Sequence, residues 1–325
     1  MEVLVTGANG FIGSHVCETL AARGHNVHAM VQPGTPLGNL RGMPIASVRP
    51  ADLRNSAALE AACAGVEVLF HLAARVTDYG PRRAFEAVNE EGTRRLCAAA
   101  RRSRRIVYMS TLAVHGFRGH RGSDETAPRD ARTEYGRSKA GGEDAVRASG
   151  LEAVVVRPGL FPFGPRDRTS FFPLAAALEG GRVALIDGGS ALLSTAYAPN
   201  LALGMALAGE SPAAAGRTYV IGDGSPLTWR EIFDRICAKL GCPPPRRSFP
   251  SALVLPAASL LEWMFLLADV RKPPPITRYR IGLLRGDFYF ESARARDELG
   301  FVPPVGFEEA LERTVAWYRE VRPRP

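Results

Sequence analysis

Two side chains able to exchange a proton stand four residues apart in the stretch TEYGRSKAGGE, residues 133–143. Tyr135 and Lys139 would face the same side of a helix, because positions i and i+4 are neighbours on a helix surface. Tyrosine has an ordinary pKa of about 10, and a nearby ammonium favours its charged form, which suits a proton donor or acceptor. The spacing alone leaves open the alternative that both residues simply face solvent.

A glycine-rich stretch, TGANGFIGSHVCETLAARGH, follows the first apolar run and places Gly7, Gly10 and Gly13 at GxxGxxG spacing. Glycine is needed where the backbone turns sharply and approaches a pyrophosphate, and the following helix offers free N–H groups and the positive end of its dipole. The motif lies between a predicted strand and a predicted helix, as a dinucleotide-binding fingerprint requires. We therefore predict that it binds a dinucleotide.

Short apolar runs alternate with amphipathic stretches along the first half of the chain. Such near-continuous apolar strands are typical of a parallel sheet covered by helices on both faces. We expect an α/β fold with a doubly wound parallel Rossmann sheet. The expected strands are 2–7, 26–31, 45–50, 66–73, 105–111 and 152–159, and the expected helices are 11–23, 55–64, 83–101 and 135–149.

The alternation loosens after Arg157, where glycine and proline become frequent. A chain of 325 residues is long for a single core. We expect a dinucleotide-binding Rossmann domain at 1–158, to which a segment around 190–225 returns. The region 159–325 is expected to form mainly a smaller, discontinuous substrate-binding lobe.

The composition, with 46% hydrophobic and 23% charged residues, is that of a soluble globular protein. The formal net charge of +8 comes almost entirely from arginine, because the only lysines are Lys139, Lys239 and Lys272. The densest basic cluster, RRSRR at 101–105, is typical of a helix end, so we predict no nucleic-acid partner. The five cysteines form no CxxC pair and no leader precedes the first strand, which favours the cytoplasm. No spacing of His, Asp and Glu predicts a metal site.

These motifs arrive in the order of a known family. The chain resembles the extended short-chain dehydrogenases/reductases of the NAD-dependent epimerase/dehydratase superfamily over essentially its whole length. The matching motifs are TGANGFIG, ADL at 51–53, HLAA at 71–74, AVNEEGT at 87–93, YMSTLAVHG at 108–116, YGRSK at 135–139 and VVRPGLFPFGPRD at 155–167.

The resemblance implies a catalytic set. Tyr135 would be the acid or base that moves the hydroxyl proton, and Lys139 would hold the cofactor ribose and favour the phenolate. A Ser or Thr after the fifth strand would hydrogen-bond the substrate oxygen, and counting back from VHG assigns this role to Thr111, with Ser110 as its alternative. Asn89 matches a helix asparagine that supports the site.

The resemblance also implies the residues around NAD. Asp52 and Leu53 match a pair that contacts adenine, although Asp52 could instead cap the next helix. Gln32 stands where an acid would select NAD and an arginine NADP; it cannot neutralise a phosphate, which favours NAD and leaves NADP as the alternative. The expected cofactor-binding residues are Gly7, Asn9, Gly10, Phe11, Ile12, Gly13, Gln32, Asp52, Leu53, Leu72, Ala73, Ala74, Tyr135, Lys139, Pro158 and Gly159.

The C-terminal part indicates the branch of the family. The apolar segment 251–270, PPPITRYR at 273–280 and FESARARDELGFVP at 290–303 resemble 3β-hydroxysteroid dehydrogenases, sterol-4-carboxylate 3-dehydrogenases and bacterial 3-oxo-acid reductases. This implies an NAD(P)-dependent oxidoreductase that interconverts a 3-hydroxyl and a 3-oxo group on a hydrophobic, sterol-like substrate, or on a 3-hydroxy acid with decarboxylation. A nucleotide-sugar epimerase or dehydratase and a non-catalytic dinucleotide sensor stay as alternatives.

The segment 251–270, SALVLPAASLLEWMFLLADV, also suggests a membrane contact. Its proline and its two acidic residues argue against a span, so it is either a buried helix of the lobe or a helix lying on the membrane surface. The residues behind this reasoning are Pro256, Glu262 and Asp269 within the segment, and Arg246, Arg247, Arg271 and Lys272 beside it. A homodimer through 83–101 and 135–149 is a further expectation.

Overall fold

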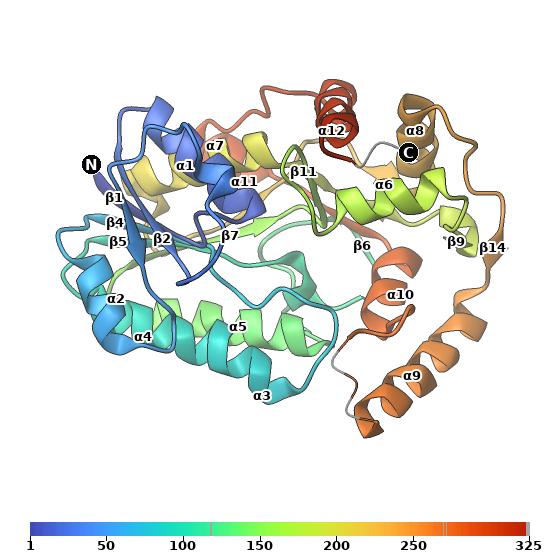
Figure 1. The fold of residues 1–325 in the computed structure, drawn as a ribbon, viewed down its shortest axis with the longest axis horizontal. Coiled ribbons are helices and arrows are strands. Elements are labelled where there is room, and N and C mark those ends of the chain that lie inside the picture. The colour runs from blue at the N-terminus through green and yellow to red at the C-terminus, as the bar shows by residue number, and fades with distance from the viewer. Residues whose placement is uncertain (118, 269, 271, 323–325) are drawn as a thin grey trace.

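The computed structural model describes residues 1–117, 119–268, 270 and 272–322. A parallel sheet of seven strands lies at its centre, in the order β12-β7-β5-β4-β1-β2-β3 (Figure 1). The order reverses between β1 and β4, and in such a sheet ligands bind beyond the carboxyl ends of the strands at this reversal. The strands are β1 (Glu2–Thr6), β2 (Asn26–Val31), β3 (Ser47–Pro50), β4 (Val68–His71), β5 (Arg105–Met109), β7 (Glu152–Pro158) and β12 (Thr218–Ile221).

Helices cover both faces of this sheet, as expected for a doubly wound fold (Figure 1). One face packs against α1 (Phe11–Ala22), α7 (Ala198–Glu210) and α11 (Ala293–Leu299), and the other against α2 (Ser56–Cys63), α4 (Glu91–Ala99) and α5 (Glu134–Arg147). Two of these helices, α7 and α11, and the strand β12 come from the second half of the chain. The Rossmann fold is therefore confirmed, whereas the division at residue 158 stays a prediction.

The predicted helix 83–101 is not a uniform α-helix. It starts as α3 (Arg82–Phe85), passes through one π-helical turn, η2 (Glu86–Glu90), and continues as α4. A π-turn inserts one extra residue into a helix and is frequent at functional sites. Here it carries Asn89, whose side chain is buried with an exposed fraction of 1%.

The rest of the chain forms an aromatic-rich lobe beside the sheet (Figure 1). Its short strands are β6 (His120–Ser123), β8 (Phe161–Phe163), β9 (Leu185–Ile186), β10 (Leu192–Leu193), β11 (Thr195–Tyr197), β13 (Leu227–Thr228), β14 (Ser248–Phe249) and β15 (Phe288–Phe290). Its helices are α6 (Phe171–Glu179), α8 (Trp229–Leu240), α9 (Ser251–Leu267), α10 (Arg278–Arg285) and α12 (Phe307–Val321). The described residues also form four 3₁₀ turns, namely η1 (Gly38–Leu40), η3 (Leu112–His115), η4 (Asp187–Gly189) and η5 (Pro212–Ala214).

Candidate active site

Tyr135 lies where the end of β5 meets the start of α5. Thr133 fixes this start, because its hydroxyl accepts a hydrogen bond from the N–H of Gly136 at 3.1 Å and so caps the helix. The Tyr135 hydroxyl shares a hydrogen bond with the Thr111 side chain. Burial raises the pKa of Tyr135 to about 12, and the Thr111 hydrogen bond acts in the opposite direction. The two predicted catalytic hydroxyls are thus neighbours.

Ser110 and Thr111 occupy different environments although they are adjacent. The Ser110 hydroxyl is buried and donates a hydrogen bond to Oε1 of Glu143 at 2.6 Å. The Thr111 oxygen instead accepts a bond from the N–H of Ala113 at 3.2 Å, which leaves the Thr111 proton free to be donated toward Tyr135. This geometry favours Thr111 over Ser110 as the hydroxyl that meets the substrate.

Lys139 lies one helical turn after Tyr135 and is 1% exposed. Its Nζ is 4.1 Å from the ring centroid of Tyr108, a cation–π distance. Burial lowers the pKa of Lys139 to about 7, and the Glu143 carboxylate partly offsets this effect. An added hydrogen-bond acceptor such as a ribose hydroxyl would stabilise the ammonium here.

Asn89 joins the loop after β4 to α5. Its Oδ1 accepts a bond from the N–H of Arg75 at 2.7 Å, and its Nδ2 donates to the carbonyl of Arg75 at 3.1 Å and to the hydroxyl of Ser138 at 2.9 Å. Both amide protons are therefore used. On α5 Asn89 thus bonds Ser138, the residue before Lys139, and so holds the helix that carries the lysine to the loop at Arg75.

Hydrogen bonds to Thr6 at the end of β1 hold the HLAA stretch, residues 71–74, in place. The Thr6 oxygen accepts bonds from the N–H groups of Leu72 at 3.1 Å and Ala73 at 3.0 Å, and it contacts Nδ1 of His71 at 2.8 Å. The other ring nitrogen of His71 contacts the Thr93 hydroxyl at 3.0 Å. Burial, and secondly Lys139, lower the pKa of His71 to about 3, so the ring is a neutral packing residue.

The glycine loop forms a cradle at the start of α1. Gly7 has a φ of 68°, and a Cβ on Gly13 would lie 2.1 Å from the Gly7 carbonyl oxygen, so side chains are excluded at both positions. The α1 helix begins after Gly10 without a side-chain cap from any described residue. The N–H groups of Phe11 and Ile12 therefore have no partner within the helix and suit an anion such as a pyrophosphate.

The residues predicted around the adenosine also gather on this side. Asn9 donates to the Thr35 hydroxyl at 2.9 Å and so holds the loop after β2. Gln32 donates to Oδ2 of Asp52 at 3.2 Å, and Arg54 pairs with the same carboxylate at 2.7 Å. Together, mainly through the Arg54 hydrogen bonds, these contacts hold the pKa of Asp52 well below its usual range.

The alternative role of Asp52 as a helix cap is wrong. The cap of α2 is Asn55, whose side chain accepts a bond from the N–H of Ala58 at 3.1 Å. Asp52 is three residues too early to serve this end, and its carboxylate turns toward Gln32 and Arg54 instead. Leu53, beside it, is buried against Gly92 of α4 and contributes to packing.

The residues predicted beside the nicotinamide lie in chain segments at the ends of β4 and β7. Ala73 lies so close to Gly7 that a Cβ on Gly7 would be 3.0 Å from its Cα, and Ala74 continues this loop. Pro158 ends β7, and a Cβ on Gly159 would lie 2.5 Å from the Thr195 carbonyl oxygen. The predicted cofactor residues therefore converge at one edge of the sheet, as the parallel strand order requires.

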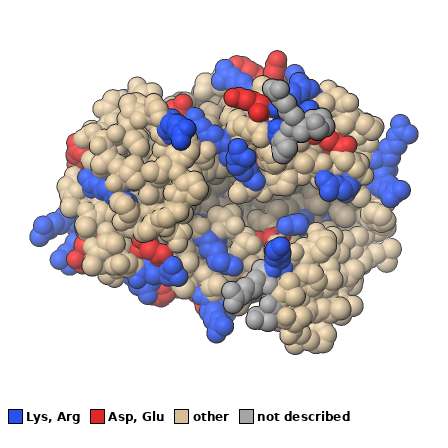
Figure 2. Space-filling view, in the orientation of Figure 1, with Lys and Arg blue, Asp and Glu red and all other residues tan. Residues whose placement is uncertain are grey.

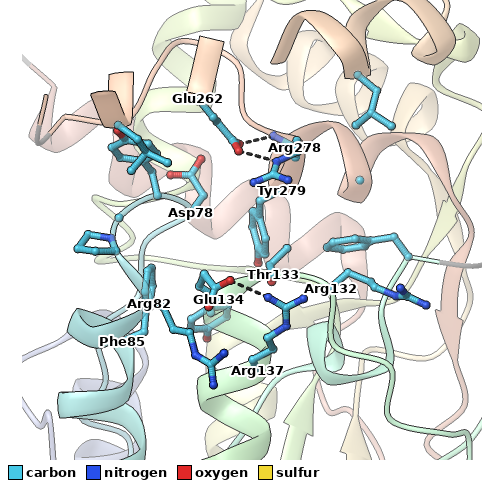
Figure 3. A pocket seen from close by; sticks show the side chains of 18 of the residues that line it. Asp78, Arg82, Phe85, Arg132, Thr133, Glu134, Arg137, Glu262, Arg278 and Tyr279 are labelled. Atoms are coloured by element: carbon cyan, nitrogen blue, oxygen red, sulfur yellow. Dashed lines mark hydrogen bonds and ion pairs between the residues drawn. The ribbon is translucent and has the colours of Figure 1, made fainter. Parts of the chain in front are cut away.

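A cavity of about 580 Å³ opens beside Tyr135. Figure 3 shows the ring of Tyr279 pointing from α10 into this cavity, toward Thr133. The rings of Tyr279 and Tyr135 meet edge to face with centroids 6.2 Å apart. Apolar lining residues include Phe117, Leu255 and Leu266. Arginines and carboxylates also line the cavity, namely Arg82, Arg132, Arg137, Arg278, Arg285, Asp78, Glu134 and Glu262.

Sequence reasoning missed several residues of this site. Tyr279 belongs to PPPITRYR and Glu143 to TEYGRSKAGGE, so both lay within stretches already singled out. Asp78 was not noticed, because nothing in the sequence shows that it reaches α10, where it accepts a bond from the Thr277 hydroxyl at 3.0 Å and pairs with Arg280 at 2.6 Å. These contacts join segments about 200 positions apart, which no local pattern reveals.

Comparison with known proteins agrees with this geometry. Residues 3–222 match the NAD dependent epimerase/dehydratase family. The chain is 32% identical to a 2-alkyl-3-oxoalkanoate reductase of Stenotrophomonas maltophilia, over 97% of this chain and 99% of the relative. It is 30% identical to a 3β-hydroxysteroid-dehydrogenase/decarboxylase of Arabidopsis thaliana, over 96% of this chain and 78% of the relative.

Solved structures show the same fold. The crystal structure of gox2253 is 29% identical and superposes with a TM-score of 0.82, covering 98% of each chain. The dTDP-glucose 4,6-dehydratase DesIV of Streptomyces venezuelae, solved with NAD and TYD bound, is 26% identical with a TM-score of 0.81, covering 99% of this chain and 98% of that one.

A Rossmann sheet, a glycine cradle and a tyrosine and lysine one turn apart define an NAD-binding oxidoreductase of the extended short-chain type. The chain belongs to the NAD dependent epimerase/dehydratase family, in the branch that resembles 3β-hydroxysteroid dehydrogenases. NAD is the cofactor of this family, and the cradle described above fits it. None of the helices in the described part of the chain is long and apolar enough to cross a membrane.

Proposed function

We propose that the enzyme interconverts a 3-hydroxyl and a 3-oxo group on a hydrophobic substrate. One observation carries this proposal. Tyr135, which is hydrogen-bonded to Thr111, lines the same cavity as several apolar side chains. A substrate held by Leu255, Leu266 and Phe117 would present an oxygen to the two hydroxyls.

The residues divide the work of proton transfer. In the direction of oxidation, Tyr135 as phenolate accepts the proton of the substrate hydroxyl, and in reduction it returns that proton. Thr111 donates its single hydroxyl proton in a hydrogen bond that orients the substrate oxygen. Lys139 adds a positive charge one turn away. When bound, NAD supplies the hydride acceptor, and NADH supplies the donor.

The proposed substrate class is supported by a cavity whose lining includes both apolar and basic side chains. Five arginines line it. Arg82, Arg132, Arg137 and Arg278 already pair with carboxylates of the chain, so Arg285 is the remaining candidate partner for a carboxylate on the substrate. This suits a 2-alkyl-3-oxo acid, as in the name of the Stenotrophomonas relative, or a sterol that carries an acid group, as the name of the Arabidopsis dehydrogenase/decarboxylase suggests. A nucleotide-sugar substrate is the second candidate, because the same arginines could bind a diphosphate.

Measured turnover decides between these substrates. Purified protein with NAD or NADH is offered a 3β-hydroxysteroid, a 2-alkyl-3-oxoalkanoate and dTDP-glucose, and the change in NADH absorbance and the products are recorded. We expect the hydrophobic compounds to react and Tyr135→Phe to be inactive while it still binds NAD. Turnover of dTDP-glucose alone would overturn the proposal in favour of the second candidate, and tight NAD binding without any turnover would favour a sensor.

Two further proposals concern partners. The first is a homodimer in the cytoplasm through 83–101 and 135–149, which lie side by side as α4 and α5 on one face of the sheet (Figure 1). Analytical ultracentrifugation of the wild type and of charge-reversed variants of the outer α4 surface measures the oligomeric state.

The second proposal is a peripheral membrane contact through 251–270. Asp269 and Arg271, which entered the sequence argument, lie outside the described residues.

A further inference from the structure

Helix α9 is strongly apolar and yet almost unburied. Of its described residues, Ala258 and Glu262 alone are buried. The exposed side chains recur at positions i, i+7, i+10, i+11 and i+14, which places them on one face of the helix. They are Leu253 (71% exposed), Leu260 (59%), Trp263 (59%), Met264 (51%) and Leu267 (68%). A continuous apolar face of this kind marks an interaction site rather than ordinary surface.

The opposite face of α9 belongs to the candidate active site. Leu255 and Leu266 line the cavity beside Tyr135, and so does Glu262. Glu262 holds α9 to α10, because its carboxylate accepts bonds from the backbone N–H of Arg278 at 2.6 Å and from Nε of Arg278 at 2.7 Å. The same helix is thus a wall of the cavity and an exposed apolar surface.

A small hydrophobic cluster completes the attachment. Ala258 packs with Ile186 and Ile281, away from the main cores of the molecule. At the start of the helix, the N–H of Ser251 donates to Oδ1 of Asp187 at 2.8 Å. This attachment covers the inner side of α9 and leaves its outer side without a protein partner among the described residues.

The charged side chains around α9 indicate which kind of partner could cover its exposed face. Exposed basic side chains lie before the helix, after it and at the end of α10, namely Arg246, Arg247, Lys272 and Arg285. The carboxylates described nearby are engaged: Glu262 with Arg278, Asp78 with Arg280, and Asp187 with the start of α9. Figure 2 shows the surface over α9 as a largely uncharged area with basic side chains beside it. An apolar face with basic neighbours is the pattern of helices that lie on anionic lipid.

We propose that α9 docks on an anionic lipid surface, with its outer apolar face inserted and the neighbouring basic side chains at headgroup level, and that hydrophobic substrate passes from the lipid along α9 into the cavity. The second clause rests on the function proposed above, whereas the docking itself does not. Docking would place the cavity beside the phase in which an insoluble substrate is concentrated.

Vesicle binding tests the docking without any substrate. The full chain with NAD is mixed with vesicles of phosphatidylcholine alone or with phosphatidylglycerol and is sedimented. We expect co-sedimentation that is stronger with phosphatidylglycerol, and a blue shift of tryptophan emission that disappears in Trp263→Phe. Trp229, which is 6% exposed in the core, serves as the internal reference. Leu260→Glu and Trp263→Glu should bind vesicles roughly tenfold more weakly or worse, because each loses the transfer of a large apolar side chain.

A matched control separates docking from a general effect of added charge. Val302 is 64% exposed and belongs to a different part of the chain, so Val302→Glu should bind vesicles like the wild type. Each glutamate variant is first shown to bind NAD, which confirms its fold. Arg246→Glu combined with Arg247→Glu should remove the preference for phosphatidylglycerol.

Other outcomes overturn the docking. Equal recovery of wild type in the supernatant with both vesicles would do so, as would equal binding of Trp263→Glu and wild type. A wild-type dimer that Leu260→Glu converts to a monomer would show that a second copy of the chain covers α9 instead. Vesicle binding without turnover of any hydrophobic compound would retain the docking and reject the function proposed above.

Discussion

The protonation of Tyr135 decides whether it can act as a base. Burial raises its pKa to about 12, which favours the protonated phenol at neutral pH. Thr111 lowers the pKa but does not compensate for burial. A positive nicotinamide ring beside the phenol would favour the charged form further, because an opposite charge stabilises it.

This predicts that NAD binding lowers the pKa of Tyr135. The sign follows from the charges: the phenolate is negative, oxidised NAD adds a positive ring, and Lys139 adds an ammonium. The tyrosinate absorbance of wild type minus that of Tyr135→Phe is titrated with and without NAD, and the midpoint should fall when NAD is present. An unchanged midpoint would contradict this account of how the base forms.

The hydroxyls of Ser110 and Thr111 predict different mutant phenotypes. Thr111→Ala should reduce kcat while leaving NAD affinity intact, and Tyr135→Phe should reduce kcat by about 10²–10⁴. Ser110→Ala should mainly lower stability, because it removes the bond to the buried Glu143. Steady-state kinetics and urea unfolding of the three variants check this, and a larger kinetic effect from Ser110→Ala would reverse the assignment.

The cofactor preference can be tested at Gln32. An arginine there can pair with the 2′-phosphate of NADP, but Asp52 lies within hydrogen-bond distance of the present side chain and would compete for it. We therefore expect Gln32→Arg to improve the ratio of NADP to NAD efficiency, and Gln32→Arg combined with Asp52→Asn to improve it more. If neither variant changes the ratio, position 32 does not face the ribose.

At the scale of elements, one buried ion pair joins three segments of the candidate site. Arg157 at the end of β7 donates to both oxygens of Glu143 on α5, at 2.8 and 2.7 Å, and both side chains are at most 3% exposed. Ser110 at the end of β5 bonds the same carboxylate. Burial raises the pKa of Glu143, but the Arg157 and Ser110 hydrogen bonds prevail and lower it to about 2. Glu143 thus shares α5 with Tyr135 and Lys139, and Arg157 is next to Pro158 in β7.

Removing one partner of this pair should be costly. Arg157→Met would leave the buried Glu143 carboxylate with only the partly exposed Arg147 and Arg129 as ionic partners, at 3.1 and 3.6 Å, so the cost should approach the roughly 3–5 kcal/mol of a broken buried pair. The double variant with Glu143→Leu should lose less, because no buried charge is left alone. Urea unfolding of both variants measures these free energies, and a double variant less stable than the single one would show that the pair itself stabilises the fold.

Helices and strands with a clear apolar periodicity could be predicted from the sequence. Irregularities within an element and contacts between distant segments could not. The six predicted strands are present, each within a few residues of its expected bounds. The π-turn at Glu86–Glu90, which carries the buried Asn89, was not predicted, because EAVNE has an ordinary helical composition. The predicted catalytic residues gather as expected, but Tyr279 joins them only through the contacts of α10 with Asp78 and Glu262.

At the scale of the whole molecule, the structure shows where the excess of basic side chains lies. Much of the arginine is engaged in ion pairs with nearby carboxylates, such as Arg94 with Glu90 and Glu91. Exposed basic side chains also lie around α9, beside the apolar face. The pattern of the segment 251–270 alone did not distinguish a buried helix from a surface helix, because both are apolar. Its exposure in the fold favours the surface.

The place of β12 in the sheet also affects how the chain is made. This strand pairs with β7 along Thr218–Ile221, and α7 covers the neighbouring face. While the ribosome is still adding the first lobe segments, β7 therefore remains an open edge, and an open edge of a sheet invites pairing with other chains. A nascent chain released at residue 158 would carry every predicted catalytic side chain and still be prone to aggregate.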